Sequence, residues 1–282
     1  MITAVVTTVH RRHAHLRNQI RGLQRSRHAP DMHIVVALGD SDVPAVVRQE
    51  GRGADVVECP GRKPLPLAAA RNHGARAALD RGADHLIFLD VDCIPSEDLV
   101  DRYRQVAADT EHRDALLCGP VTYLPPAGPD GYDLTGLAAQ VRPHPARPWP
   151  PDGSVQNGTE YALFWSLSFA VQADVWDRIG GFCEQYTGYG GEDTDFARCA
   201  QVRGVPMRWV GGAHAFHQHH PVEDPPVGHL HDIVRNARIY HRRWGSWPMG
   251  GWLDAFERLE LITRRPDGTP EVLVSAASPD VR

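Results

Sequence analysis

The chain has 282 residues, of which 42% are hydrophobic and 23% charged, so it can bury a full core and lies outside the disordered class. Its 30 basic and 35 acidic residues give a formal net charge of −5, which excludes binding of nucleic acid or another extended polyanion through bulk charge. The unusual counts are 16 histidines and a single lysine, Lys63, and the arginine bias indicates a GC-rich genome.

The cysteines and the N-terminus indicate the cellular compartment. The 5 cysteines are widely spaced and form no CxxC pair, which favours a reduced intracellular protein. Residues 1–9 have no basic residue before their apolar run, so they are predicted to form a first strand rather than a signal peptide. No window reaches the roughly 18 apolar residues that a membrane span needs. We expect a cytoplasmic protein without a transmembrane segment, whose membrane contact would be peripheral, at the inner face.

The first hundred residues alternate strand and helix patterns. Strands are predicted at 2–9, 33–38, 54–59 and 85–89, and helices at 16–25, 43–50 and 67–81. Such alternation predicts an α/β fold with a mostly parallel sheet covered on both faces. Ligands bind such sheets beyond the carboxyl ends of the strands, so we expect the site in the loops that begin at Thr7, Gly39 and Asp90.

The second half of the chain begins with a proline-rich segment, residues 119–151. Its prolines rule out long regular elements and are typical of a binding loop or lid; they are Pro120, Pro125, Pro126, Pro129, Pro143, Pro145, Pro148, Pro150 and Pro151. Alternation resumes at 161–171, 174–179, 193–203 and 207–210. Two helices follow, at 231–243 and 252–261, and residues 263–282 are predicted to be a flexible tail.

Two carboxylates, Asp90 and Asp92, stand where the apolar strand 85–89 ends. Two acids at the end of a buried strand are costly unless a cation compensates them. A D-x-D pattern in this position suits Mn²⁺ or Mg²⁺ that also holds a diphosphate. The competing interpretation is that these acids only cap the helix that follows Pro95 and Ser96.

A glycine turn at 188–191 leads directly into three acids, Glu192, Asp193 and Asp195. Acids in the first turn of a helix are favoured by its dipole, and this could explain one of them. Aromatic side chains precede the turn, and an aromatic wall beside carboxylates is a common way to hold a sugar ring. Asp193 is therefore a candidate general base.

Four histidines lie between residues 213 and 221, directly after the strand 207–210: His214, His217, His219 and His220. Such density indicates that at least one of them binds a metal. A structural zinc site built from His214 and His217 with His229 and His231 is the alternative, although no cysteine lies nearby and no HExxH helix is present.

Several motifs together resemble those of a known family. The run from Phe164 to Phe182, followed by Tyr189-Gly-Gly-Glu-Asp193, is similar to the C-terminal motif of galactosyltransferases and related family 2 glycosyltransferases. The segments 7–11, 70–74 and 90–92 resemble the nucleotide-sugar half of the same GT-A fold. The resemblance covers about residues 1–221, in the family's order.

The resemblance implies one Rossmann-like GT-A domain over residues 1–262. Within it, residues 1–118 would bind the nucleotide sugar, 119–160 would be an acceptor loop, 161–221 would be the catalytic half and 222–262 would add helices. A UDP-sugar would be the donor. Its binding residues would be Thr7 and Arg11 beside the nucleotide, Asp40 at uracil, Arg71 and Asn72 near the diphosphate and ribose, and Asp90 and Asp92.

The resemblance also implies the metal and acceptor residues. Asp92 would bind Mn²⁺ or Mg²⁺ directly, and Asp90 would touch ribose or a metal-bound water. The segment 215–218 resembles that of bacterial chondroitin-type polymerases, which makes His217 the third ligand, with His214 as the alternative. The acceptor, a glycan, lipid-linked or small molecule with a free hydroxyl, would meet Trp165, Tyr189, Gly190, Gly191 and Glu192.

Asp193 would then act as the base of an inverting displacement. The family has tryptophan at the position of Tyr189 and often glycine at that of Trp165, so the sequence names neither the acceptor nor the donor sugar. Three other functions stay open: a sugar nucleotidyltransferase, a zinc-stabilised binding module and a retaining glycosyltransferase. The first is disfavoured because no glycine-rich phosphate loop follows the first strand.

Overall fold

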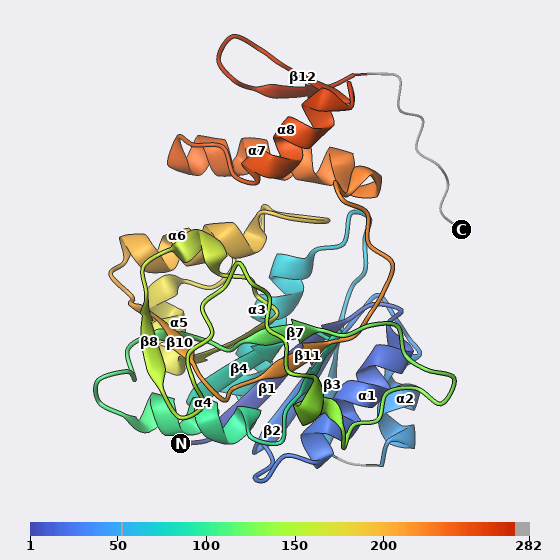
Figure 1. Cartoon of the computed structure of the whole chain (residues 1–282), viewed down its shortest axis with the longest axis vertical. Coiled ribbons are helices and arrows are strands. Elements are labelled where there is room, and N and C mark those ends of the chain that lie inside the picture. Colours follow the sequence, from blue (N-terminus) through green and yellow to red (C-terminus); the bar gives the residue numbers. More distant parts are fainter. Residues whose placement is uncertain (52, 274–282) are drawn as a thin grey trace.

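The computed structural model describes residues 1–51 and 53–273, and its centre is an eight-stranded sheet with the order β3-β2-β1-β4-β9-β6-β10-β8 (Figure 1). The strands are β1 (Thr3–Val9), β2 (Met32–Leu38), β3 (Ala54–Cys59), β4 (His85–Leu89), β6 (Leu116–Cys118), β8 (Val155–Gly158), β9 (Ser168–Gln172) and β10 (Met207–Val210). Strands β1 to β4 are parallel to one another. Strand β9 runs antiparallel to β4 and β6, while β10 is parallel to β6 and β8 antiparallel to β10.

Helices cover both faces of the sheet. Consecutive strand residues point to opposite faces, so Val6 packs in one core and Val5 in another. The first core also takes side chains from α3 (Leu67–Leu79), α5 (Ala173–Ile179) and α6 (Glu192–Val202). The opposite face is covered by α1 (His13–Gln24), α2 (Val43–Gln49) and α4 (Leu99–Ala108). The predicted α/β architecture with a mostly parallel sheet is therefore confirmed.

A close approach of α3 to the sheet explains the glycine of its Arg-Asn-His-Gly motif. A Cβ atom at Gly74 would lie 2.5 Å from Val6 and 2.7 Å from Val36, so any larger side chain would push the helix away. Gly74 thereby sets the distance between α3 and the sheet. Arg71 and Asn72 lie one turn earlier on this helix, so Gly74 also sets how close they lie to the carboxyl ends of the strands.

A second sheet of three short strands stands beside those ends. It consists of β5 (Cys93–Pro95), β11 (Ala215–His217) and β7 (Val121–Tyr123), with β11 in the middle. In its register His217 lies opposite Cys93 on one side and Tyr123 on the other. Strands of three residues are too short for a periodic pattern, so the sequence did not predict this sheet. It brings the residues that follow β4 next to the histidine-rich segment.

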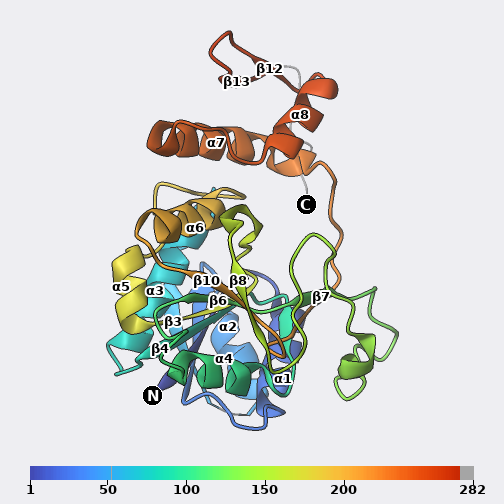
Figure 2. The same ribbon diagram turned by 60° about the vertical axis from the view of Figure 1, so that its left-hand side comes forward.

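The proline-rich segment leaves β7, forms a 3₁₀ turn at Leu137–Gln140 and returns before β8. Figure 2 shows it projecting beside β7 at the right. On its return it runs along β7: the backbone N–H of Arg142 donates to Thr122 Oγ1 at 2.8 Å and that of His144 donates to the Val121 carbonyl at 3.2 Å. Another 3₁₀ turn, Tyr161–Leu163, precedes β9.

The C-terminal part is a small layer above α6 (Figure 1). After a 3₁₀ turn at Val227–His229, it contains α7 (Leu230–Trp244), α8 (Gly250–Arg258) and the hairpin of β12 (Ile262–Arg264) and β13 (Pro270–Val272). The hairpin differs from the flexible tail expected from residue 263 onward, because Ile262 is buried against a core that includes Phe256. Residues 274–282 of that expected tail lie outside the described residues. Within the described part of the chain, no helix combines the length and apolar character needed to cross a bilayer.

Candidate functional site

The two carboxylates that end β4 have different surroundings. Asp90 pairs with Arg71, whose Nη2 lies 3.1 Å from Asp90 Oδ1. Asp92 is held through its backbone, since its carbonyl accepts from the N–H of Gln218 at 2.7 Å. Its Oδ1 atom is buried without a hydrogen-bond partner among the described residues. A buried carboxylate oxygen without a hydrogen-bond partner is costly, and a bound cation would compensate that cost.

Two histidines complete a group that can hold a metal. One ligand atom each of Asp92, His217 and His220 lies within 4.8 Å of the others. The Nε2 atom of His220 is 3.6 Å from Asp92 Oδ2. Burial lowers the pKa of His217 to about 4, so this ring is neutral at pH 7, as a metal-binding imidazole must be. One carboxylate and two imidazoles suit a divalent ion that keeps positions open for another ligand.

The other two metal candidates lie outside this group. The His214 ring nitrogen Nε2 is 2.8 Å from Thr122 Oγ1 on β7, and the Asp90 carboxylate is occupied by Arg71. A second group of possible ligands, His13, Asp40 and Asp42, lies at the end of β2. There Asp40 Oδ2 is 2.9 Å from His13 Nε2 and accepts the Arg11 N–H at 2.7 Å.

The candidate nucleotide-sugar-binding residues near the N-terminus lie in different surroundings. Thr7 is fully buried, and its hydroxyl donates to Gln19 Oε1 at 2.8 Å. Arg11 adopts a left-handed backbone with φ of 57°. The next residue, Arg12, points to the metal group, with its Nη1 3.6 Å from Asp92 Oδ1. His15, at the start of α1, lies 4.0 Å from the same oxygen.

Arg71 and Asn72 connect the donor-side strands with the second half of the chain. Arg71 is buried and also donates through Nη1 to Glu192 Oε1 at 3.1 Å. Asn72 exchanges two hydrogen bonds of 2.9 Å with the backbone of Phe182. The Phe182 ring lies 5.3 Å from the Arg71 guanidinium. These contacts fix the turn ahead of the glycine-rich segment relative to Asp90.

The glycine turn is a backbone requirement. Gly188, Gly190 and Gly191 have φ of 70°, 86° and 93°, a left-handed region that other residues rarely adopt. A Cβ atom at Gly188 would also lie 2.0 Å from Asp232 Oδ2. The buried Asn236 on α7 donates to the carbonyls of residues 187, 189 and 190 at 2.7–3.2 Å. The turn thus delivers Glu192 and Asp193 as the first two residues of α6, which begins one residue before the predicted segment 193–203.

The three acids of α6 have separate environments. Burial raises the pKa of Asp193 to about 7, with a further contribution from the negative charge of Glu192. Glu192 Oε1 binds Arg71, whereas its Oε2 is buried without a partner among the described residues. Asp195 is fully buried and accepts from Tyr186, Arg243 and Trp244 at 2.7–3.1 Å. Asp195 therefore anchors α7, while Asp193 has the pKa of a general base at neutral pH.

The two aromatic acceptor candidates contact different parts of the chain. Tyr189 is 40% exposed and stacks on His229, with ring centroids 4.5 Å apart, next to Trp252 at 5.7 Å. Trp165 contacts His144 and the guanidinium of Arg147 instead. The C-terminal layer therefore extends the aromatic surface at the glycine turn. The sequence did not single out His220 from the other clustered histidines, and it suggested His229 only for a zinc site and not beside Tyr189.

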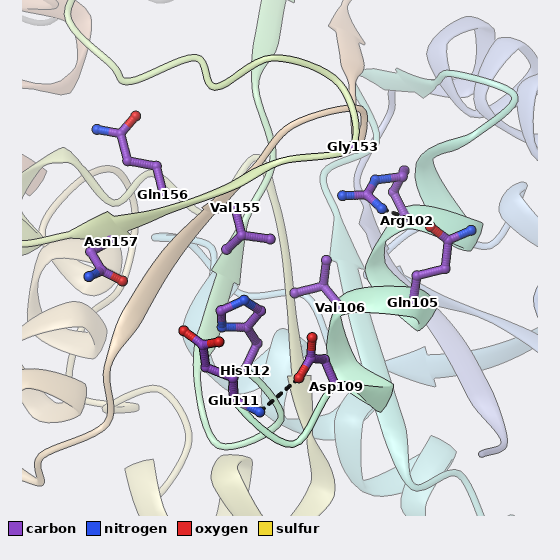
Figure 3. A pocket seen from close by; sticks show the side chains of 10 residues that line it. All are labelled: Arg102, Gln105, Val106, Asp109, Glu111, His112, Gly153, Val155, Gln156 and Asn157. Carbon is purple, nitrogen blue, oxygen red and sulfur yellow. Dashed lines mark hydrogen bonds between the residues drawn. The ribbon is translucent and has the colours of Figure 1, made fainter.

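A separate cavity lies away from these residues. It has a volume of about 770 Å³ and is lined by α4, the turn at residues 111–112 and the edge strand β8 (Figure 3). Its lining is polar, with Asp109, Glu111 and His112 grouped at one end. The candidate donor, metal and acceptor residues are not among those that line it.

Comparison with known proteins gives the family context. A family model described as the N-terminal domain of galactosyltransferase matches residues 155–221. This segment runs from β8 through the glycine turn, Asp193, His217 and His220. Among solved structures, S. aureus TarS 1-349 in complex with UDP-GlcNAc superposes with a TM-score of 0.60 and 13% identity, covering 90% of this chain and 75% of that chain. The chain has a GT-A glycosyltransferase fold.

Two further structures share this GT-A fold. GalNAc-T7 with UDP, GalNAc and Mn²⁺ matches with a TM-score of 0.56 and 12% identity over 86% of this chain and 50% of that one. The mannosyltransferase PcManGT from Pyrobaculum calidifontis, in complex with GDP-Man and Mn²⁺, matches with a TM-score of 0.51 and 14% identity, over 91% and 64%.

Sequence relatives are also glycosyltransferases. The validoxylamine A glucosyltransferase of Streptomyces hygroscopicus subsp. jinggangensis (strain 5008) is 30% identical over 159 residues, which cover 50% of this chain and 36% of the relative. Its counterpart in subsp. limoneus is 30% identical over 159 residues, with 50% and 34% coverage. This GT-A chain thus spans about a third of the length of the curated relatives that it matches.

Proposed function

We propose that the chain is a metal-dependent glycosyltransferase that moves a hexose or N-acetylhexosamine from a UDP-sugar to an acceptor hydroxyl. The observation that carries this proposal is the contact of Arg71 with both Asp90, two residues before Asp92, and Glu192, the residue before Asp193. This link through neighbouring residues supports a single site that would contain both the metal group and the candidate base. The related structures of GalNAc-T7 with UDP, GalNAc and Mn²⁺ and of TarS with UDP-GlcNAc support a nucleotide-sugar donor and a divalent ion.

The donor side of this mechanism uses the residues around Asp92. Asp92, His217 and His220 would hold Mn²⁺ or Mg²⁺, which supplies positive charge to the leaving diphosphate when bound. Arg12, 3.6 Å from Asp92, is placed to bind a diphosphate oxygen. Asp90 is kept in position by Arg71, and the lone pairs of its carboxylate that Arg71 does not use would accept from a ribose or sugar hydroxyl.

The acceptor side uses the first turn of α6. The acceptor hydroxyl would donate to Asp193, which takes its proton as the oxygen attacks the anomeric carbon. The new C–O bond forms on the face opposite the bond to the diphosphate, which breaks, so the configuration inverts. Glu192 Oε2, buried and without a partner among the described residues, would accept from a second acceptor hydroxyl. Tyr189 would pack against the acceptor ring.

A panel of UDP-sugars tests this function. The protein is incubated with each donor and Mn²⁺, and UDP release by slow hydrolysis is measured with and without EDTA, alongside thermal shift. We expect at least one donor to stabilise the protein and to be hydrolysed only with the metal. Absence of any response to any UDP-sugar would contradict the proposal.

The competing functions give different results in related measurements. Release of inorganic diphosphate from UTP and a sugar phosphate would indicate a nucleotidyltransferase. Zinc that survives dialysis, without donor turnover, would indicate a binding module. An anomeric configuration in the product equal to that of the donor, determined by NMR, would replace the inverting mechanism with a retaining one.

A further inference from the structure

Arg147, near the end of the proline-rich segment, is buried in an unusual way. Only 6% of the residue is exposed, and Nε, Nη1 and Nη2 are all buried without a hydrogen-bond partner among the described residues. Its guanidinium carbon lies 5.1 Å from the Trp165 ring centroid and 4.8 Å from that of Trp209. The cation is thus held by two tryptophans rather than by a carboxylate.

Such a position is costly for the fold. A buried charge without an ionic partner loses its hydration, and cation–π contacts return only part of that free energy. Burial accordingly lowers the pKa of Arg147, and the ionisable groups that act on it most strongly are thiols and phenols. A methionine would fill similar space without this cost. Stability alone therefore does not explain an arginine here.

The same segment makes a second contact with Trp165. The His144 ring meets the Trp165 ring edge-to-face, with centroids 4.9 Å apart, and lies 5.7 Å from Tyr123. The backbone N–H of Arg147 donates to the His144 carbonyl at 3.1 Å, so the two residues form one turn. Trp165 is consequently contacted by both side chains of this turn.

The contacts continue to the metal group. The Tyr123 ring packs against His217, with centroids 4.7 Å apart, and the two residues are also paired between β7 and β11. A continuous set of side-chain contacts therefore runs from Arg147 through Trp165, His144 and Tyr123 to His217.

We infer that Arg147 is a positioning residue that holds the proline-rich segment against Trp165 and Trp209. It thereby fixes the position of the Trp165 ring. Through His144 and Tyr123 it also fixes the position of the His217 imidazole. This inference rests on the proposed function for its kinetic consequence, namely binding of the nucleotide-sugar donor. Its structural consequence, closure of the segment over Trp165, is independent of that function. The planar guanidinium is required because it can stack on two indole faces at once, which an ammonium group cannot do.

Three variants test this role. Arg147→Met removes the charge and keeps the length, Arg147→Lys keeps the charge and loses the plane, and Arg142→Met is the matched control because Arg142 is exposed on the same segment. Chymotrypsin cleavage within the segment, which contains Tyr132, Leu134 and Leu137, reports its closure. Calorimetry of UDP with Mn²⁺, and KM and kcat for the donor, report the site.

For Arg147→Met we expect cleavage about tenfold faster, because the segment opens. We expect a donor KM about tenfold higher, with kcat within about twofold, because Trp165, His144 and Tyr123 no longer hold the His217 imidazole in position. The cleavage rate and donor KM of Arg147→Lys should lie between those of Arg147→Met and wild type, and those of Arg142→Met should equal the wild-type values. Wild-type cleavage and wild-type KM in a folded Arg147→Met protein would overturn the inference.

A fourth variant covers the case in which Arg147→Met does not fold. His144→Ala leaves Arg147 in place and interrupts the contacts between Trp165 and Tyr123. We expect weaker UDP–Mn²⁺ binding with wild-type protection from chymotrypsin, and unchanged binding would overturn the coupling to His217. If no UDP-sugar is bound by the wild type, the proposed function fails, whereas the cleavage measurement still decides whether Arg147 closes the segment.

Discussion

Arg71 donates a hydrogen bond of 3.1 Å to Glu192, a residue 121 positions later in the chain. The other arm of the guanidinium pairs with Asp90, also at 3.1 Å. One buried cation therefore neutralises a carboxylate from each half of the site. Because Glu192 precedes Asp193, the same contact fixes the start of α6 relative to the end of β4.

Replacing Arg71 by methionine leaves these two carboxylates without their shared cation. Removing one partner of a buried ion pair costs about 3–5 kcal/mol, and we expect a loss of this size in the free energy of unfolding, measured with urea. Arg76→Met is the control, because Arg76 lies on the same helix and is exposed. A loss in Arg71→Met no larger than that of the control would contradict the structural role.

Asp193→Asn is expected to keep UDP and Mn²⁺ binding and to lose transfer. The amide has nearly the same shape but cannot take a proton, and general-base catalysis contributes roughly 10²- to 10⁴-fold in rate. Initial rates of transfer, together with calorimetric UDP affinity, separate these effects. Asp177→Asn, at an exposed position of α5, should match wild type. Wild-type turnover in Asp193→Asn would remove Asp193 from the mechanism.

The pH dependence of the rate should follow the same carboxyl group. Its pKa of about 7 means that Asp193 is protonated, and inactive as a base, below neutral pH. We expect kcat/KM to fall about tenfold per pH unit below that value and to level off above it. A rate that stays constant from pH 5 to pH 8 would exclude this group as the base.

The raised pKa also affects stability, with a definite sign. Burial favours the protonated form of Asp193, so its stabilising contribution is complete below the ordinary value of 3.8 and is lost as pH rises through about 7. Because asparagine does not ionise, Asp193→Asn does not lose this stability as pH rises. The melting temperature of Asp193→Asn minus that of wild type should therefore be larger at pH 8 than at pH 4.

Asp195, two residues later, should give the opposite phenotype. It is fully buried and receives hydrogen bonds from Arg243 and Trp244 of α7, both 2.7 Å long. Asp195→Ala leaves the Arg243 cation without its partner, and we expect a loss of about 3–5 kcal/mol in the free energy of unfolding. Denaturant titration measures it, and a change below about 1 kcal/mol would show that α7 is anchored elsewhere.

Much of this architecture could be predicted from the sequence. The alternation of strand-type and helix-type segments up to residue 89 predicted the parallel strands. Each of these strands is recognisable because a strand buried on both faces is a continuous apolar run in the sequence. The position of Asp90 and Asp92 at the end of such a strand, and the glycines ahead of Glu192, are likewise local features of the chain.

The partners of those residues could not be predicted, because they depend on contacts between distant segments. The association of His220 with Asp92 requires the small sheet that places β11 beside β5. Arg12 rather than Arg11 points to Asp92 because Arg11 turns the backbone through a left-handed conformation. The contact of Arg147 with two tryptophans joins segments that no periodic pattern relates.

Metal-dependent binding of the nucleotide is the central claim, and titration of UDP into the protein by calorimetry tests it most directly. We predict saturable binding with Mn²⁺ and at least about tenfold weaker binding in EDTA, consistent with the effect of losing a metal contact to a diphosphate. His217→Ala and His220→Ala should resemble the EDTA result, while His219→Ala, at an exposed position, should resemble wild type. Equal UDP affinity with and without Mn²⁺, or no binding in either condition, would contradict the account.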